Sequence, residues 1–163
     1  MRRWLPAALL VLSLGLAACA NDDATRDDTG AVATEGSVDA FAIELGDCVA
    51  DPTAGTDPNE VAEVEEIRAI PCDQPHDGEV YHVFDMPDGE YPGEDGVAAA
   101  VAEGCEGAFA DFVGLPYEES SLDYISLQPT QETWEQLEDR EVVCIVADPS
   151  GEQTTGSLRD AAI

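Results

Sequence analysis

Hydrophobic and polar side chains alternate along several short stretches of the chain, which is the pattern of strands with one buried face. Residues 79–86 (EVYHVFDM) and 140–148 (REVVCIVAD) are also rich in β-branched and aromatic side chains, which favour strands. The start of residues 61–70 is ambiguous between a helical turn and an extended segment, and we expect a strand that runs into Cys72. The predicted strands are residues 41–45, 61–70, 79–86, 122–128 and 140–148, with residues 155–158 as a candidate edge strand.

One segment has the three- and four-residue spacing of an amphipathic helix. Its shared face holds Val97, Val101, Cys105, Ala108 and Phe112. Asp95 is placed to cap the start of this helix, and Gly114 followed by Pro116 to end it. Residues 130–138, which contain Trp134, predict a turn or a short helix. The order β-β-β-α-β-β predicts an α+β fold in which an antiparallel sheet packs on one main helix.

The start of the chain has the organisation of a lipoprotein signal peptide. Two arginines precede the apolar stretch of residues 4–16, which is shorter than the ~20 residues that a membrane-spanning helix needs. Two alanines and then Cys19 complete a lipobox, in which the thiol is lipidated and cleavage makes this cysteine the new N-terminus. We therefore predict a signal peptide over residues 1–18 and a lipid anchor, with palmitate among its acyl chains, at Cys19. The alternative is an ordinary secretory signal with an incidental cysteine.

Residues 19–38 are acidic and contain few large apolar side chains, so they cannot bury enough surface to offset the entropy of ordering. We interpret them as a flexible tether that holds the domain off the bilayer. Residues 39–163 are predicted to form one domain of ordinary size, and none of them belongs to a stretch of transmembrane length. The expected location is the outer face of the cell membrane.

The chain is strongly acidic, with 6 Lys and Arg against 36 Asp and Glu, and it contains no lysine. The predicted signal carries two of the arginines and no acidic residue, so the mature net charge is 4 − 36 = −32. Nucleic acid and anionic lipid are disfavoured partners because like charges repel. Residues 85–95 form an acidic loop that lacks the EF-hand spacing. A solvated acidic surface and a surface for divalent cations or a basic partner both fit this composition.

Five cysteines fit an exported chain. With Cys19 lipidated, four remain, and four cysteines allow three pairings. We predict a bond between Cys48 and Cys72, because they flank a strand–loop–strand unit whose ends can meet. We pair Cys105 with Cys144 because each lies on the predicted core face of its element. None of the cysteines lies in a C-x-x-C pair, which argues against a zinc knuckle or thioredoxin chemistry.

Residues 71–79 form the most distinctive run in the chain. His76 and Asp77 are adjacent in it and His82 follows on the next strand, so the three are candidates for a metal or acid–base site. The alternative is structural, with two prolines stiffening a turn in which His76 and Asp77 satisfy backbone groups. No H-E-x-x-H, Walker or G-x-S-x-G motif accompanies them. We therefore predict no catalytic residue, no cofactor and no metal, and take His76 and Asp77 as candidate binding residues.

Several short motifs occur in a fixed order over residues 43–160. They are Gly46-Asp47-Cys48, Pro71-Cys72 with Pro75-His76-Asp77 and Glu79-Val80, Gly104-Cys105, Leu127-Gln128-Pro129-Thr130 with Trp134, Asp139-Arg140 with Val143-Cys144, and Gly156-Ser157-Leu158. In this order they resemble the septum-formation domain family, extracytoplasmic modules of high-GC Gram-positive bacteria that are often lipoproteins. The resemblance implies a role at the division septum and supplies no catalytic residues. The chain departs from the family pattern in an acidic insert around residues 51–66 and in Glu138, where glycine is expected.

These observations predict a non-enzymatic binding or scaffolding module of the cell envelope, linked to septum formation through the resemblance. Its expected partners are the membrane, through the lipid anchor, and envelope or division proteins. The binding surface is predicted to be the stiff loop of residues 71–79. Trp134 is either a partly exposed aromatic anchor of that surface or a core residue. The alternative function is a cation-binding sensor or an envelope hydrolase that uses His76 and Asp77.

Overall fold

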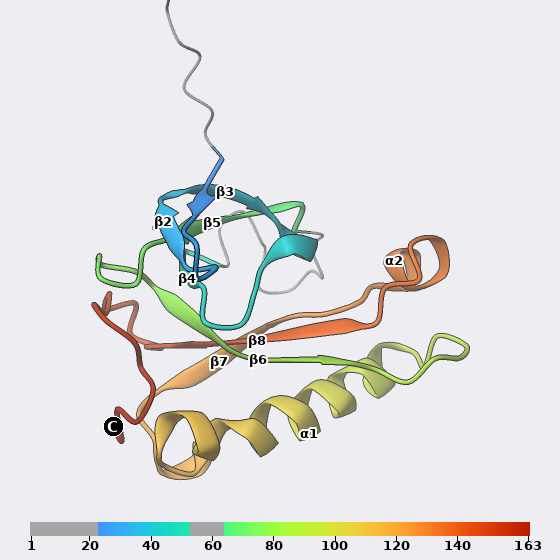
Figure 1. Ribbon diagram of the computed structural model, residues 1–163. Helices are drawn as coiled ribbons and strands as arrows, with labels where there is room; N and C mark the ends of the chain where they lie inside the picture. The colour runs from blue at the N-terminus through green and yellow to red at the C-terminus, as the bar shows by residue number, and fades with distance from the viewer. Residues whose placement is uncertain (1–22, 53–63) are drawn as a thin grey trace, which may run out of the picture.

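A computed structural model describes residues 23–52 and 64–163 of the protein (Figure 1). The predicted signal peptide, Cys19, most of the acidic insert around residues 51–66 and the first three residues of the strand predicted at residues 61–70 lie outside the described residues. Within the described part of the chain, no helix combines the length and apolar character that crossing a membrane requires.

The core of the fold is a six-stranded sheet in which every neighbouring pair of strands is antiparallel. Its strands are β3 (Gly36–Asp39), β4 (Cys48–Ala50), β5 (Glu66–Ile70), β6 (Gly78–Asp85), β7 (Asp123–Leu127) and β8 (Glu141–Ala147), in the spatial order β3-β5-β4-β6-β8-β7. The main helix, α1 (Glu94–Val113), follows β6, and the short helix α2 (Gln131–Gln136) joins β7 to β8. Of the predicted order β-β-β-α-β-β, the second and third strands, the helix and the last two strands are found as β5, β6, α1, β7 and β8, whereas the first predicted strand, residues 41–45, is not formed and β4 follows it in the chain. The α+β fold class is therefore confirmed.

α1 lies across one face of the sheet (Figure 1). Its buried residues are Val97, Val101, Cys105, Phe109, Phe112 and Val113, which follow the predicted helical spacing. A Cβ atom at Gly104 would clash with the Phe84 ring, so glycine at this position lets the helix approach β6 closely. Gly114, with φ of 88°, ends the helix as predicted. The predicted cap is wrong, because α1 begins after Gly93 without a side-chain cap and Asp95 lies in the first turn.

The opposite face of the sheet is also largely buried. Along β8, Val142, Cys144 and Val146 face α1, whereas Val143 and Ile145 belong to a second apolar cluster. Its other buried members are Ile43, Val49, Ile67 and Val80. Because both faces are covered, β8 is apolar at almost every position instead of alternating.

The N-terminal part of the domain differs from the prediction. β1 (Thr25–Arg26) and β2 (Val32–Thr34) pair as a two-stranded ribbon, and β3 pairs with β5 at the edge of the sheet. This corrects the flexible tether predicted for residues 19–38, because the chain is folded onto the domain from Asp23 onward. A contact between Arg26 and the distant Asp47 replaces the apolar burial that these residues lack.

The strand predicted at residues 41–45 is also not found. Residues Ala40–Ala42 form a turn of 3-10 helix, in which the Asp39 side chain accepts a hydrogen bond from the backbone N–H of Phe41. Only Ile43 of the apolar positions is buried, while Phe41 and Leu45 are 56% and 60% exposed. The alternating pattern therefore reflects one core contact and two exposed side chains.

Two disulfides join distant parts of the fold, and both have the predicted pairing. Cys48 is bonded to Cys72 with a Cα–Cα distance of 5.2 Å, and Cys105 to Cys144 at 5.6 Å. The second bond fixes α1 to β8 inside the core, where both cysteines are fully buried. The edge strand predicted at residues 155–158 is not formed. The C-terminal segment contributes an isolated antiparallel bridge, between Thr154 and His76.

Candidate binding site

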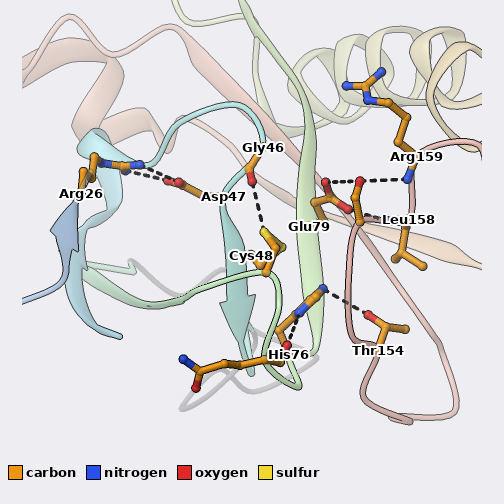
Figure 2. The surroundings of a disulfide bond; sticks show 12 residues. Arg26, Gly46, Asp47, Cys48, His76, Glu79, Thr154, Leu158 and Arg159 are labelled. Carbon is orange, nitrogen blue, oxygen red and sulfur yellow. Dashed lines mark hydrogen bonds and ion pairs between the residues drawn. A yellow bond between two sulfur atoms is a disulfide. The ribbon is translucent and has the colours of Figure 1, made fainter. Parts of the chain in front are cut away.

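His76, the first candidate, is a structural residue. Its imidazole is fully buried, with Nδ1 2.9 Å from the Gln74 carbonyl and Nε2 3.2 Å from the hydroxyl of Thr154 (Figure 2). The backbones of His76 and Thr154 also exchange two hydrogen bonds of 2.9 Å. His76 thus holds the C-terminal segment on the sheet, and its ring is not presented to a ligand.

Asp77 and His82 do not join His76 in a shared site. Asp77 Oδ2 accepts hydrogen bonds from the backbone N–H of Asp51 at 2.8 Å and from Gln153 Nε2 at 3.3 Å. The half-buried His82 ring stacks on Phe84, with ring centroids 5.4 Å apart. Within residues 23–52 and 64–163, His, Cys, Asp and Glu side chains form no group of three or more that could hold a metal ion. The same finding covers the acidic loop 85–95.

Two buried carboxylates near the Cys48–Cys72 bond were not identified from the sequence. Asp47, 3% exposed, accepts two hydrogen bonds from the Arg26 guanidinium, at 2.6 and 2.7 Å, and one from the backbone N–H of Glu44. Glu79, 4% exposed, accepts from the Ser157 hydroxyl at 2.8 Å and from the Leu158 backbone N–H at 2.6 Å. Figure 2 shows that both carboxylates flank the same stretch of the sheet. Asp47 secures the N-terminal ribbon and Glu79 secures the C-terminal segment.

Trp134 is a core residue and not a partly exposed anchor. It is 4% exposed, and its indole N–H donates to the carbonyl of Gly89 at 3.0 Å. The guanidinium of Arg140 lies 3.7 Å from the centre of the ring on one side, and Tyr91 packs edge-on at 5.8 Å. Trp134 therefore ties the acidic loop to α2 and fixes the position of Tyr91.

An open groove of about 980 Å³ lies beside this cluster, between the start of α1 and the start of α2. Its walls are formed by Tyr91, Pro92, Gly93, Glu94 and Asp95 on one side and by Gln128, Pro129, Thr130, Gln131 and Glu132 on the other. Figure 1 shows these two segments together at one end of the molecule, where α2 meets the loop that leads into α1. The groove combines an aromatic ring, two prolines and amide side chains with carboxylates, which is the mixture of apolar and directed polar groups that binding sites use.

The Thr130 side chain shapes the second wall of the groove. Its hydroxyl accepts a hydrogen bond from the Thr133 backbone N–H at 3.1 Å, and the Thr133 hydroxyl accepts one from the Thr130 backbone N–H at 3.0 Å. This reciprocal cap starts α2 directly after Pro129, whose side chain is fully buried. The wall is therefore rigidly held before any ligand arrives.

A second, smaller groove of about 550 Å³ lies beside Arg140. The residues that line it are Phe41, Asp85, Met86, Pro87, Asp88, Glu138, Asp139, Arg140 and Glu141. Burial, reinforced by the charges of Asp85 and Asp139, raises the pKa of Glu141 above its ordinary value. The guanidinium of Arg140 lies over the Trp134 ring and donates to the Trp134 carbonyl, and its Nε lies 3.5 Å from Asp88.

A protein-family model for septum formation matches residues 12–144. The chain belongs to the septum formation family. No match was found among curated proteins or among solved structures. The match begins within the predicted signal peptide and ends at Cys144, so the Gly156-Ser157-Leu158 motif of the resemblance lies beyond it.

Most motifs that carry the family resemblance are structural in this member. Asp47, His76 and Glu79 bond the N-terminal ribbon or the C-terminal segment to the sheet, Cys48 is bonded to Cys72 in the loop after β5, and Cys105 bonds α1 to β8. The run Gln128-Pro129-Thr130 is the motif that lines the larger groove. The sequence could have indicated this site through the Thr130–Thr133 cap, but Tyr91 and the opposite wall come from a segment more than thirty residues away.

Proposed function

We propose that this member of the septum formation family is a non-enzymatic binding module of the cell envelope that engages its partner at the larger groove. The family links the chain to septum formation. The observation that carries the proposal is the groove itself, which is preformed by the α2 cap and by the Trp134–Tyr91 packing and is lined by the Gln128-Pro129-Thr130 run on which the resemblance partly rests. A scaffold needs such a presented and rigid surface, because a preorganised site loses little entropy when it binds.

We further propose that the protein is held on the outer face of the cell membrane by a lipid at Cys19. The lipobox in the sequence supports this, and so do the two disulfides, which form in oxidising compartments. Cys19→Ser is expected to abolish labelling by a fatty-acid probe and to leave precursor or released protein. Labelling that is unchanged in this variant would exclude the anchor.

A matched pair of charge reversals tests the groove. Asp95 and Glu103 are exposed acids on the same helix, and only Asp95 lines the groove. In cells that express a fluorescent fusion, Asp95→Arg is expected to reduce enrichment at the division site, whereas Glu103→Arg keeps it. Both variants change the net charge equally, so a general electrostatic effect would reduce the enrichment of both at the division site to the same extent. If Asp95→Arg localises like the unmodified protein, the groove is not the binding site.

The alternative of a sensor or hydrolase built on His76 and Asp77 gains no support from the geometry. Both nitrogens of His76 contact protein groups, and the Asp77 carboxylate accepts hydrogen bonds from the loop around it. An enzyme would need one of these groups to reach a substrate. We therefore place recognition at the groove.

A further inference from the structure

The folded domain begins very close to the proposed lipid site. Asp23 forms a bridge with Ser37, and the backbone N–H of Ala24 donates to the Ser37 carbonyl at 2.9 Å. Two residues later, Arg26 makes its paired contact with Asp47, donates to the Gly30 carbonyl at 3.0 Å and donates to the Ala42 carbonyl at 3.2 Å. The chain is thus fixed to the domain from Asp23 onward.

Only four peptide units separate Cys19 from this fixed point, because residue 23 is the fourth after residue 19. A fully extended chain spans at most ~3.5 Å per residue, so the two Cα atoms are never more than ~14 Å apart. Residues 23–163 number 163 − 22 = 141. A compact domain of that size has a radius of gyration of ~14 Å and a radius of ~19 Å for a uniform sphere.

These two lengths limit how the domain can stand on a bilayer. The centre of the domain cannot come closer to the headgroups than about its own radius, ~19 Å. Asp23 cannot rise more than ~14 Å above the anchor. Asp23 therefore always lies below the centre of the domain, in the half that faces the membrane.

We propose that attachment at Cys19 fixes the orientation of the domain, with the β1–β2 ribbon toward the lipid headgroups and α1 toward the outside. The proposal rests on the lipid anchor of the proposed function. In Figure 1 the ribbon and α1 lie on opposite sides of the sheet, while α2 and the loop before α1 lie at one end. The larger groove then lies to the side of the domain, away from the ribbon that faces the headgroups.

The ribbon does not adhere to lipid, so the tether alone sets the orientation. Asp23, Asp27, Asp28 and Glu35 are exposed on this part of the molecule. The two arginines nearby are paired, Arg26 with Asp47 and Arg68 with Glu35 at 2.9 Å. Like charges on anionic lipid repel such a surface. We therefore expect no binding to vesicles of anionic phosphatidylglycerol when the domain is not attached.

The orientation is measured on vesicles to which the mature chain is coupled through Cys19. The other four cysteines are bonded to one another, so a maleimide headgroup lipid reacts with Cys19 alone. Energy transfer from tryptophan to a dansyl headgroup lipid reports the distance to the bilayer. The donors are Thr34→Trp, on the exposed ribbon opposite Thr25, and Glu103→Trp, on the exposed side of α1. The unmodified chain, whose Trp134 is the only tryptophan after residue 18, supplies the baseline.

Thr34→Trp is expected to add several-fold more transfer than Glu103→Trp. Insertion of about 16 Gly and Ser residues after Asn21 supplies a long flexible tether and is expected to make the energy transfer from the two positions equal. Equal transfer from both positions at native tether length, or stronger transfer from Glu103→Trp, would overturn the proposal. Thr25→Trp repeats the ribbon measurement from the neighbouring strand. Because the coupling is chemical, the outcome is independent of whether cells lipidate Cys19, which the fatty-acid probe tests separately.

Discussion

The ion pair between Arg26 and Asp47 is expected to control whether the N-terminal ribbon stays on the domain. The two partners differ in burial, since the Arg26 side chain is 25% exposed and that of Asp47 is 3% exposed. Removing the carboxylate charge leaves an arginine that water can still reach. Removing the arginine leaves a buried carboxylate whose remaining hydrogen bond comes from the Glu44 backbone N–H.

This asymmetry gives different costs for the two substitutions. Asp47→Asn keeps the shape and loses charge-assisted hydrogen bonds, which contribute about 1.5–3 kcal/mol. Arg26→Ala leaves an uncompensated buried charge, which destabilises by ~3–5 kcal/mol when no relaxation is possible. Relaxation is possible here, because undocking of residues 23–34 lets water reach Asp47. The free energy of unfolding therefore cannot fall by more than the ribbon contributes, and part of the loss appears as local opening.

Urea denaturation and hydrogen exchange separate the two effects. In Arg26→Ala, the Ala24 amide, which is bonded to Ser37, is expected to lose its protection, while amides of β6 and β8 keep theirs. Arg68→Ala is the control, because the Arg68–Glu35 pair is about half exposed and such pairs contribute ~0–1 kcal/mol. The double variant of Arg26 and Asp47 should cost less than the sum of the single variants. A larger loss for Asp47→Asn than for Arg26→Ala would refute the argument from burial.

Four further outcomes are expected. Replacing Cys105 and Cys144 together by alanine should lower the free energy of unfolding by ~3–4 kcal/mol in urea titrations, because the bond closes a loop of 39 residues. Burial and, to a smaller extent, the charges of Asp85 and Asp139 raise the pKa of Glu141 above 4.5, so ionisation of Glu141 opposes folding. The contribution of Glu141 to the free energy of unfolding is complete below pH 4.5 and is lost as the pH rises through the raised pKa. Glu141→Gln should therefore raise the melting temperature at pH 7 and lose this advantage at pH 3, unlike the exposed Glu138→Gln. His76→Ala should destabilise the protein by ~1–3 kcal/mol and expose the segment after residue 150 to proteolysis, because buried partners lose their hydrogen bonds. The melting temperature should rise with sodium chloride, because screening weakens repulsion in a chain with a net charge of −30, and an unchanged value would argue against this repulsion.

The central part of the fold was predictable because its signals are local. The apolar spacing of α1 and the β-branched composition of β6 and β8 describe contacts that each element must make, whatever its partner. The disulfide pairing followed from the same reasoning, since Cys105 and Cys144 lie on faces that periodicity alone assigns to the core. A segment with such a pattern is assigned as the same helix or strand in any fold that buries its apolar face.

The ribbon and the groove were not predictable, because they depend on contacts between residues far apart in the sequence. Residues 23–34 have little apolar surface, and they are held by backbone pairing and by an arginine that contacts a carboxylate 21 residues away. The groove exists only because Trp134 brings Tyr91 next to the run that begins at Gln128. His76 shows the same limit, because its chemistry suggests a site and only its contact with Thr154 shows that both nitrogens are occupied.

The buried polar contacts around the Cys48–Cys72 bond serve the groove indirectly. Asp47 holds the start of the chain, and His76 and Glu79 hold its end, so both termini of the domain are fixed to the central sheet (Figure 2). A strongly acidic chain cannot rely on its surface to keep loose ends in place, because these ends repel the rest of the domain. In the orientation that we propose, the short link between Cys19 and Asp23 would transmit the position of the anchor to the whole domain. The groove at the α2 end would then have a defined direction relative to the membrane, which a domain on a long tether would not have.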